Sequence, residues 1–479
     1  MEKTKARPTL ISISKKSFIQ VSLLLLGLLI LSVALTYMIP KGEFGLLPDG
    51  KINYLDYVRR DDLGGIPLWK GILAPLLVFG SADGLKLIVL SLFLFVISAA
   101  FQVMNDVGGI RALVGAVSER FRDRRELLLV LISFLFYCFG AFLGLFEEML
   151  TMLPIVAALC LVVGFDSFTG FLCCILSCGF GFAGAITNPF TVLLASQLIG
   201  ANPMEHIWFR ILIFLVMFGL LQGFLFLYLR RLKKDPAASL TRRHDEALRA
   251  SAAGLLRPEE QTPERARRIK RSYTLFLLCA LALIVVSSLL LALRDYTVVI
   301  LIAYFLIFGL LAGTAACGDF RFVGKSFLRG IVGALPTIVF IALAASIKYV
   351  FDEGRVLPTI VNQINILIEG RSPVLVALII YLIVLLLEFF ISSSTAKAIL
   401  VMGLLAMVNT GLSKQMLVLL YTFGDGYTNV IFPTSPVLLI SLSMIEVEYF
   451  TWIRKSAALF AVNFLLVLAF IAFGVLIGY

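Results

Sequence analysis

Long uncharged runs, each close to the thickness of a bilayer, recur along the sequence. A helix needs about 20 apolar residues to cross the hydrocarbon core of a membrane, and seven uninterrupted runs are near this length. They cover residues 17–40, 87–105, 211–229, 273–293, 296–316, 330–347 and 456–479. The first run is too long for a signal-peptide core and lacks a small-residue cleavage site, so we expect it to remain as a membrane helix. The pattern predicts an all-α polytopic membrane protein.

Two further apolar runs, 167–204 and 415–445, are interrupted near their middle by short polar stretches. The interrupting residues include Thr187, Asn188 and Pro189 in the first run and Asp425, Thr428, Asn429, Pro433 and Thr434 in the second. Proline removes a backbone donor and clashes with the preceding turn, so a helix opens there. In lipid, an opened helix is tolerated where it lines a polar cavity. We predict two broken membrane helices, which brings the total to about nine spans.

Ionisable residues divide another apolar stretch, because residues 127–146 and 149–165 flank Glu147 and Glu148. If the two arms form a reentrant hairpin over 127–165, the glutamates lie deep in the membrane at its tip. If both arms are full spans, the glutamates lie at the outer surface. Hydropathy does not separate these alternatives; we favour the hairpin.

A second reentrant hairpin is predicted over residues 372–412, where two apolar arms meet at a polar tip. The tip residues are Ser393, Ser394, Thr395 and Lys397. Glu388 lies near the end of the first arm, where a carboxylate can snorkel to the surface, cap the helix or face the interior.

The order of a hairpin followed by a broken helix therefore occurs twice. The first repeat covers residues 17–229 and the second covers 273–479, and an odd number of spans before the second hairpin inverts its orientation. Inverted repeats with discontinuous helices are characteristic of secondary transporters. A channel would instead require rings of pore-lining groups.

Composition and charge agree with a lipid environment. The chain is 60% hydrophobic and 15% charged, with a mean hydropathy of +1.00, which excludes a water-soluble protein. The net charge of +11 arises in two segments: residues 1–16 carry five basic and one acidic residue, and residues 230–272 carry thirteen basic and six acidic ones. Because Lys and Arg collect on the cytoplasmic side, we place both segments there and expect no nucleic-acid binding.

The residues typical of enzymes are scarce. The two histidines, His206 and His244, leave little for metal sites or general-base catalysis, and the seven cysteines lie in or beside apolar runs, where we expect them to be inert. A G-x-G-x-x-G match at 179–184 lacks the strand that a nucleotide site requires. We predict no enzymatic activity, no cofactor and no resident metal.

The intramembrane charges carry the functional argument. Each centrally placed Glu, Asp or Lys costs about 2.5 to 3.5 kcal/mol when it faces lipid. Five such residues are present, namely Glu147, Glu148, Glu388, Lys397 and Asp425. They must face one another, water or a ligand. Half-helix N-termini can bind an anion, whereas opened carbonyls and hydroxyls can bind Na⁺ or a cationic group, so both kinds of cargo remain open.

Three motifs resemble a known family. They are Gly144-Leu-Phe-Glu-Glu-Met-Leu-Thr-Met-Leu-Pro154, Phe182-Ala-Gly-Ala-Ile-Thr-Asn-Pro-Phe-Thr191 and Phe423-Gly-Asp-Gly-Tyr-Thr-Asn-Val-Ile-Phe-Pro-Thr-Ser435. Over about residues 20 to 475 the chain is similar to the YfcC/DcuC-like family, often named anaerobic C4-dicarboxylate carriers, which resembles the wider ion transporter superfamily. The resemblance implies a homodimer in a bacterial inner membrane that works by an elevator-like motion. It also implies a binding site formed by the following residues: Glu147, Glu148, Thr187, Asn188, Pro189, Ser393, Ser394, Thr395, Asp425, Thr428, Asn429, Pro433 and Thr434.

The chain departs from this family at the second hairpin. The family usually reads like Ser-Gly-Ser-Gly-Gln there, whereas this sequence has Ser393-Ser394-Thr395-Ala396-Lys397. A fixed ammonium can stand in for a bound cation. We hypothesise that Lys397 either replaces a Na⁺ site or binds a carboxylate of the cargo.

The sequence thus predicts a secondary active transporter of a small carboxylate-bearing metabolite, coupled to H⁺ or Na⁺ or working by exchange. The family resemblance favours a C4-dicarboxylate. The four intramembrane acids against one lysine favour instead a basic amino acid, such as arginine or ornithine in antiport. Both alternatives stand at this stage.

Overall fold

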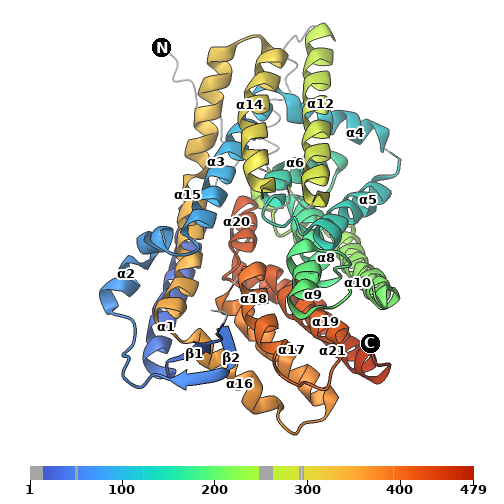
Figure 1. The fold of residues 1–479 in the computed structure, drawn as a ribbon. Coiled ribbons are helices and arrows are strands. Elements are labelled where there is room, and N and C mark those ends of the chain that lie inside the picture. The colour runs from blue at the N-terminus through green and yellow to red at the C-terminus, as the bar shows by residue number, and fades with distance from the viewer. Residues whose placement is uncertain are drawn as a thin grey trace.

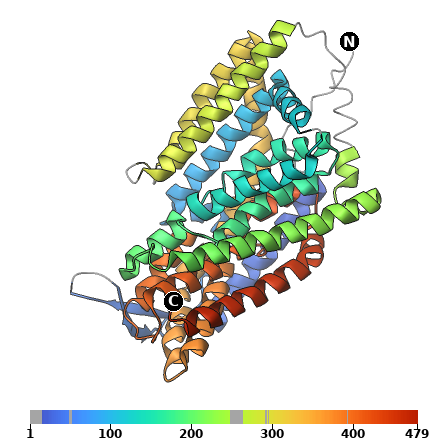
Figure 2. The ribbon, with the colours of Figure 1, turned by 90° about the vertical axis from the view of Figure 1, so that its right-hand side faces the viewer.

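The computed structural model describes residues 15–48, 52–121, 123–246, 263–290, 293, 296–391 and 393–479. Most of the predicted basic N-terminus, 1–16, and the middle of the predicted basic loop, 230–272, lie outside these residues. The described chain is almost entirely helical, as Figures 1 and 2 show. The predicted class of an all-α polytopic membrane protein is confirmed.

Eight helices among the described residues are long and apolar enough to span a membrane, against the nine spans predicted. They are Phe18–Met38, Gly84–Val107, Arg125–Leu143, Ile207–Lys234, Val298–Cys317, Phe320–Glu353, Pro373–Phe390 and Tyr449–Leu476. The two predicted broken spans are absent from this set because each is divided into short helices. Two helices in the set, Arg125–Leu143 and Pro373–Phe390, are the first arms of the predicted hairpins.

One group of helices packs around α3 and α15, and we call it the α3–α15 group. Its members are α1 (Lys15–Met38), α2 (Leu68–Leu77), the short η1 (Val78–Gly80), α3 (Gly84–Val107), α12 (Pro263–Leu289), α14 (Thr297–Cys317) and α15 (Phe320–Glu353). Small residues allow close packing: a Cβ atom added to Gly330 of α15 would lie 2.4 Å from the Cα atom of Ala99 in α3.

The remaining membrane helices form a second group, which we call the site group. From the first half it contains α5 (Arg125–Cys138), η2 (Phe139–Leu143), α6 (Met149–Val163), α7 (Ser167–Phe171), η3 (Leu172–Leu176), α8 (Ser177–Ala183), η4 (Pro189–Leu193), α9 (Leu194–Ile199) and α10 (Ile207–Lys234). From the second half it contains α17 (Pro373–Phe390), α18 (Ser394–Leu405), α19 (Lys414–Asp425), η6 (Tyr427–Val430), α20 (Pro436–Met444) and α21 (Tyr449–Leu476). Helices α4 (Gly109–Arg120) and α16 (Leu357–Ile368) lie between the two groups.

Helix α15 differs from the prediction, which expected a basic turn before a span at 330–347. The helix instead runs without interruption for 34 residues from Phe320. Arg329 lies within it and donates to Asp106 at 2.8 Å, and Asp106 also accepts from Gln102. This pairing keeps the guanidinium inside the helical packing, so the charge does not end the helix.

The segment that follows α10 lies at the same end of the molecule as the start of α1. Lys16 bonds to Glu448 at 2.8 Å, and His244 lies 3.9 Å from Glu446, two residues away. We call this the basic end. In Figure 2 the long helices run diagonally from this end, at the upper right near the N-terminus, to the opposite end at the lower left.

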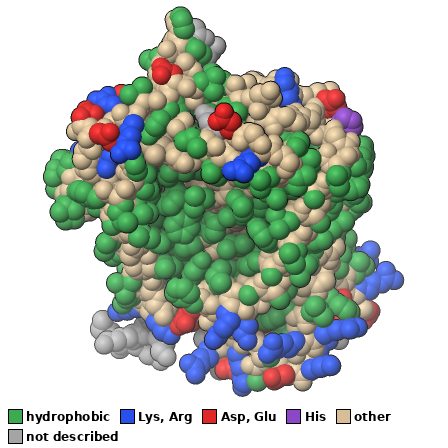
Figure 3. Space-filling view, turned by 90° about the horizontal axis from the view of Figure 1, so that it is seen from below, with side chains coloured by type: hydrophobic (Ala, Val, Ile, Leu, Met, Phe, Trp, Pro, Cys, Tyr) green, Lys and Arg blue, Asp and Glu red, His purple; other side chains and the backbone are tan. Residues whose placement is uncertain are grey.

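A small antiparallel sheet covers the opposite end, and it was not predicted. Strands β1 (Gly42–Leu46) and β2 (Ile52–Arg59) pair with an irregularity between Phe44 and Gly45. Arg355 donates to Glu43 of this sheet at 2.7 Å. A surface view shows a wide band of apolar side chains between two charged margins, which is the surface expected of a protein embedded in lipid (Figure 3).

Candidate functional site

Asn188 holds the first broken helix open and ties it to the first hairpin. Its side-chain amide donates to the Gly140 carbonyl at 2.9 Å, and its Oδ1 atom accepts from the backbone N–H groups of Phe190 and Thr191. Gly144, which has a φ of +68°, packs so closely that an added Cβ would lie 2.7 Å from Asn188 Oδ1. The hairpin therefore contacts the break in the middle of the broken helix.

The hairpin also satisfies the backbone that Pro189 leaves open. The N–H groups of Ile186 and Thr187 both donate to the Ala141 carbonyl, at 3.1 and 3.3 Å. Thr187 Oγ1 donates weakly to the Phe142 carbonyl at 3.5 Å. Because these groups are paired inside the protein, the helix can remain open at membrane depth.

The two glutamates at the first hairpin tip have different surroundings. Glu147 is exposed, whereas Glu148 is buried, with 8% of its surface accessible. Glu147 lies close enough to Asp425 of the second half for the two carboxylates to repel each other. The hairpin tip of one half thus approaches the break of the other.

In the second half, Lys397 forms the centre of a buried ion triad. Its Nζ atom lies 2.8 Å from Asp425 Oδ1 and also pairs with the Glu388 carboxylate. Lys397 and Asp425 are fully buried and Glu388 is 2% exposed. The three residues come from α18, α19 and α17, so the triad joins both arms of the second hairpin to the second broken helix.

The serines of the second hairpin tip hold the start of α18. Ser393 Oγ accepts from the Ala396 N–H at 3.4 Å and so caps the helix. Ser394 Oγ donates to Asp425 Oδ2 at 2.9 Å, and Tyr421 donates to the Ser394 carbonyl. Thr395 is half-buried beside them.

The second break is closed by its own side chains. Asn429 donates to the carbonyls of Asp425 and Gly426 at 2.8 and 3.1 Å, and Thr428 Oγ1 donates to the Gly424 carbonyl at 3.0 Å. These carbonyls lie at the end of α19, so Asn429 caps the helix that precedes the second break, whereas Asn188 caps the helix that follows the first break.

Pro433 and Thr434 lie farther along the chain from the triad than the other predicted residues. Both are buried just before α20, which packs mainly against α6 and α15. No hydrogen bond or ion pair among the described residues connects them to the triad. Pro433 and Thr434 directly precede the start of α20. Ser435 caps this helix, because its Oγ atom accepts a hydrogen bond from the Leu438 N–H at 3.4 Å.

Two charged residues of this region were not predicted as site residues. Glu388 was assigned to the first hairpin arm without a role; its signal was a lone acid in an otherwise apolar run. Arg210, in the first turn of α10, is buried and donates to the Ala185 carbonyl at 3.5 Å, beside the first break. A cation at the C-terminal end of α8 complements the helix dipole.

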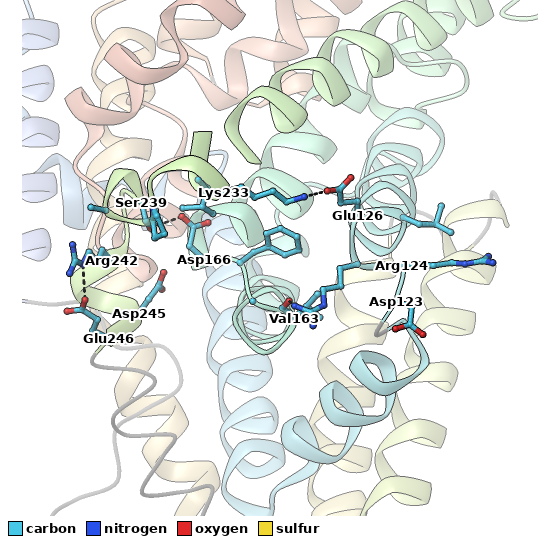
Figure 4. Close-up of a pocket in the computed structure, with 17 residues that line it drawn as sticks. Asp123, Arg124, Glu126, Val163, Asp166, Lys233, Ser239, Arg242, Asp245 and Glu246 are labelled. Carbon is cyan, nitrogen blue, oxygen red and sulfur yellow. Dashed lines mark hydrogen bonds and ion pairs between the residues drawn. The ribbon is translucent and has the colours of Figure 1, made fainter. Parts of the chain in front are cut away.

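A separate cavity of about 1020 Å³ opens at the basic end of the site group (Figure 4). Its wall includes Asp166, which accepts from Ser239 Oγ, and Lys233, which pairs with Glu126. None of the predicted site residues lines it. The cavity lies where α5, α6, α7 and the segment after α10 meet.

Comparison with known proteins identifies the family of this chain. The family of C4-dicarboxylate anaerobic carriers, DcuC, matches residues 20–476. The chain belongs to this family. It is a membrane transporter of the DcuC/YfcC type, as the three sequence motifs had indicated.

The chain is similar to two relatives and to one solved structure. It is 27% identical over 417 residues to a protein of Escherichia coli (strain K12) named "Putative basic amino acid antiporter YfcC", covering 84% of this chain and 79% of that protein. It is 23% identical over 380 residues to an uncharacterized protein of Haemophilus influenzae, covering 79% and 73%. The Alcanivorax borkumensis YdaH transporter matches with a TM-score of 0.47 and 16% identity, over 96% of this chain and 99% of that one.

Proposed function

We propose that this carrier is a secondary active transporter of a basic amino acid, which it moves by exchange. The charge balance at the centre of the site group supports this cargo. Four carboxylates, Glu147, Glu148, Glu388 and Asp425, are present with two cations: the ammonium of Lys397, which already contacts two of the acids, and the guanidinium of Arg210 beside the first break. A cargo with an amino or guanidinium group reduces the excess of negative charge.

The anion-binding groups of the site are largely occupied, which also supports a cationic cargo. Lys397 is fully buried in the triad and leaves no exposed surface for a cargo carboxylate. At the two half-helix starts, Asn188 and Ser393 accept hydrogen bonds from backbone N–H groups that an anion would otherwise use. The remaining N–H groups suffice for the single α-carboxylate of an amino acid.

Exposure of Glu147 supports a direct role for this residue. Among the four acids it is the exposed one, and it lies near Asp425 across the two halves. We infer that Glu147 binds the cationic group of the cargo while Thr187 and Thr395 line the remainder of the site. Glu148, buried behind it, adds negative charge without contacting the cargo.

A C4-dicarboxylate is the second candidate, because the family description names this class. The two carboxylates of such a cargo would then have to bind at helix N-termini close to the four acidic side chains of the site, which repel them. This cargo requires that several of those acids be protonated or paired with cations, so its uptake would depend on co-transported positive charge.

The division into two helix groups supports alternating access by an elevator-like displacement of the site group. Where they meet, Leu94 and Ile97 of α3 and Ala334 of α15 face Leu150 of α6 and Ile440 of α20 around a void of about 10 Å³. Apolar contacts of this kind let packed helices slide past each other, and the ion pair described above between the two groups, that of Lys16 with Glu448, lies exposed at the basic end. We also propose a homodimer with the basic end in the cytoplasm.

A thermal-shift screen followed by counterflow in liposomes tests the function. A ligand stabilises the protein that binds it, so arginine, ornithine and lysine are compared with succinate and fumarate. We expect the basic amino acids to raise the melting temperature and to support saturable counterflow. Stabilisation by dicarboxylates alone would favour the second candidate, whereas ohmic current or chemical turnover would contradict a carrier.

The variant Glu147→Gln tests, in the counterflow assay, whether the cargo binds at Glu147. This variant should weaken counterflow of basic amino acids at least tenfold, because it removes the exposed charge (about 1.4 kcal/mol or more). Glu126→Gln is the matched control, since Glu126 pairs with Lys233 at the surface of the basic end. Equal transport by both variants would place the cargo elsewhere.

A further inference from the structure

The buried triad carries one negative charge more than its own lysine can neutralise. Glu388, Lys397 and Asp425 are each at most 2% exposed, and one ammonium serves two carboxylates. A buried ion pair already has a large desolvation cost. An additional uncompensated carboxylate raises that cost, so this site favours the uptake of a further positive charge.

The two carboxylates differ in how well their charge is supported. Asp425 is contacted by Lys397 at 2.8 Å and by the Ser394 hydroxyl at 2.9 Å. For Glu388, Lys397 is the one partner among the described residues. Donors that contact a carboxylate stabilise its negative charge, so the charge of Asp425 has two supporting partners and that of Glu388 has one.

No other charged side chain of the described residues compensates Glu388. Helix α16, packed beside α17, has no ionisable residue, and α21 exposes Arg454 and Lys455 at the basic end. On α15, Lys348 is paired with Asp83 and Asp352.

The remaining titratable neighbours are phenols. Tyr427 and Tyr381 bond to each other, and Tyr421 of α19 donates to the Ser394 carbonyl. Neutral phenols do not change the net charge of the triad.

We propose that Glu388 is the proton site through which this carrier couples transport to H⁺. A proton from the aqueous phase forms an O–H bond on the Glu388 carboxylate, while Lys397 stays an ammonium bound to Asp425. The loaded triad is then neutral. When a cationic cargo binds near Glu147, it supplies the missing positive charge and Glu388 returns its proton to water.

The proposal rests on the proposed function in one respect, namely that the cargo carries positive charge. Its geometric part is independent of the cargo. Protonation of Glu388 makes the triad neutral in the empty carrier, so the triad itself can move through the membrane without an uncompensated charge.

Infrared difference spectroscopy on the full-length protein tests the proton site without any cargo. Acidification should produce the carbonyl stretch of a protonated carboxyl group in the wild-type protein and in Glu126→Gln. Glu388→Gln should lack this band. If the band persists unchanged in Glu388→Gln, the proposal is wrong.

Glu388→Asp is the alternative variant for the infrared experiment if Glu388→Gln does not fold. An aspartic acid absorbs at a different frequency from a glutamic acid, so the band should shift. A band at the wild-type position in Glu388→Asp would overturn the assignment.

Proton release in liposomes then separates this inference from the proposed function. With a pH-sensitive dye, wild-type protein and Glu126→Gln should release about one proton per arginine bound. Glu388→Gln should release no proton when arginine binds. Arginine binding without proton release by the wild-type protein refutes the proton site and leaves the cargo assignment intact. The opposite result is also distinguishable. If the acid-induced band depends on Glu388 but the protein binds no basic amino acid, the proton site is supported and the proposed cargo is refuted.

Discussion

Gly426 lies directly against Ala183, where the two broken helices cross. A Cβ atom added to Gly426 would lie 2.5 Å from the Cα atom of Ala183 and 2.6 Å from its backbone nitrogen. No side-chain rotation relieves contacts with backbone atoms. The breaks of the two halves therefore meet through backbone, and their spacing sets the position of Asp425, which precedes Gly426.

Gly426→Ala should separate the two breaks and reduce transport. Displacement of binding groups by about 1 Å can lower activity by roughly 10- to 100-fold, and we expect a loss of this size together with a lower melting temperature. Gly219→Ala in α10 is the control, because a Cβ there meets nothing within 4 Å. Wild-type transport by Gly426→Ala would show that this contact does not position the site.

Removing the lysine of the triad should destabilise the protein. Lys397→Gln leaves two carboxylates buried together, and loss of one partner of a buried ion pair typically costs about 3–5 kcal/mol. The double variant Lys397→Gln/Glu388→Gln should recover part of this loss, as measured by thermal unfolding in detergent. Equal melting temperatures for the single and double variants would contradict the coupling.

The same lysine predicts how transport responds to sodium. If the ammonium occupies the place of a bound cation, wild-type transport continues when choline replaces Na⁺, whereas Lys397→Gln gains activity from added Na⁺. Counterflow measured with and without Na⁺ decides this. Full Na⁺ dependence of the wild-type protein, unaltered in Lys397→Gln, would refute the hypothesis.

The sequence located the residues of the breaks because their physical cost is local. Proline within an apolar run opens a helix wherever the run lies, so Asn188 and Pro189 could be identified without knowledge of their partners. The same holds for Lys397, since an ammonium in a charge-free run must find a partner. These arguments indicate which residues are exceptional, but they do not identify the contacts.

The partners depend on packing that no periodicity specifies. Glu388 and Lys397 are nine positions apart on two arms, and they meet only because the chain turns at Ile391 to Ser393. The pairing of Arg329 with Asp106 spans 223 positions and keeps α15 continuous where a turn was predicted. Such tertiary pairs override local signals, which is why the contact between Glu388 and Lys397 and the length of α15 were not predicted.

Acidification should loosen the segment after α10. His244 is largely buried, which lowers its pKa below the ordinary value of 6.5 even though Glu446 lies 3.9 Å away and acts to raise it. The folded segment therefore binds fewer protons than the unfolded one, so its stability rises with pH and is lost as the pH falls below 6.5. Limited proteolysis of residues 235–246 should be faster at about pH 5.5 than at about pH 7.5.

His244→Gln isolates this effect from its neighbour. Burial raises the pKa of Asp245, whose carboxylate accepts from Ser167 and Thr241, and this group stabilises the fold as the pH falls. Its contribution has the opposite sign to that of His244. The glutamine variant should therefore lose the acid sensitivity; an unchanged pH profile would assign the effect to another group.

Tyr54 connects the small sheet to the second hairpin and offers a test of relative motion. Its ring covers Gly403 of α18, where an added Cβ would lie 2.6 Å from Tyr54 Cε2, and its hydroxyl donates to the Ile399 carbonyl at 3.3 Å. Tyr54 belongs to the β2 strand between α1 and α2, whereas Gly403 belongs to the site group. If the site group moves past the α3–α15 group, this contact must break in each cycle.

A cross-link between these positions should arrest transport. Tyr54→Cys removes the ring that would clash with the new side chain of Gly403→Cys. A short bifunctional thiol reagent can then link the two cysteines. The Cys279→Ser background removes the exposed native cysteine, so that it does not react. Asp83→Cys with Lys348→Cys is the control, because both residues lie in the α3–α15 group and contact each other. We expect the first cross-link to stop counterflow until it is reduced and the second to leave it intact, since the first joins the site group to the small sheet, which Arg355, just after α15, holds through Glu43. If counterflow is undiminished in the fully cross-linked Tyr54/Gly403 variant, the cargo crosses while α18 stays fixed to the small sheet. That result would refute the elevator-like motion.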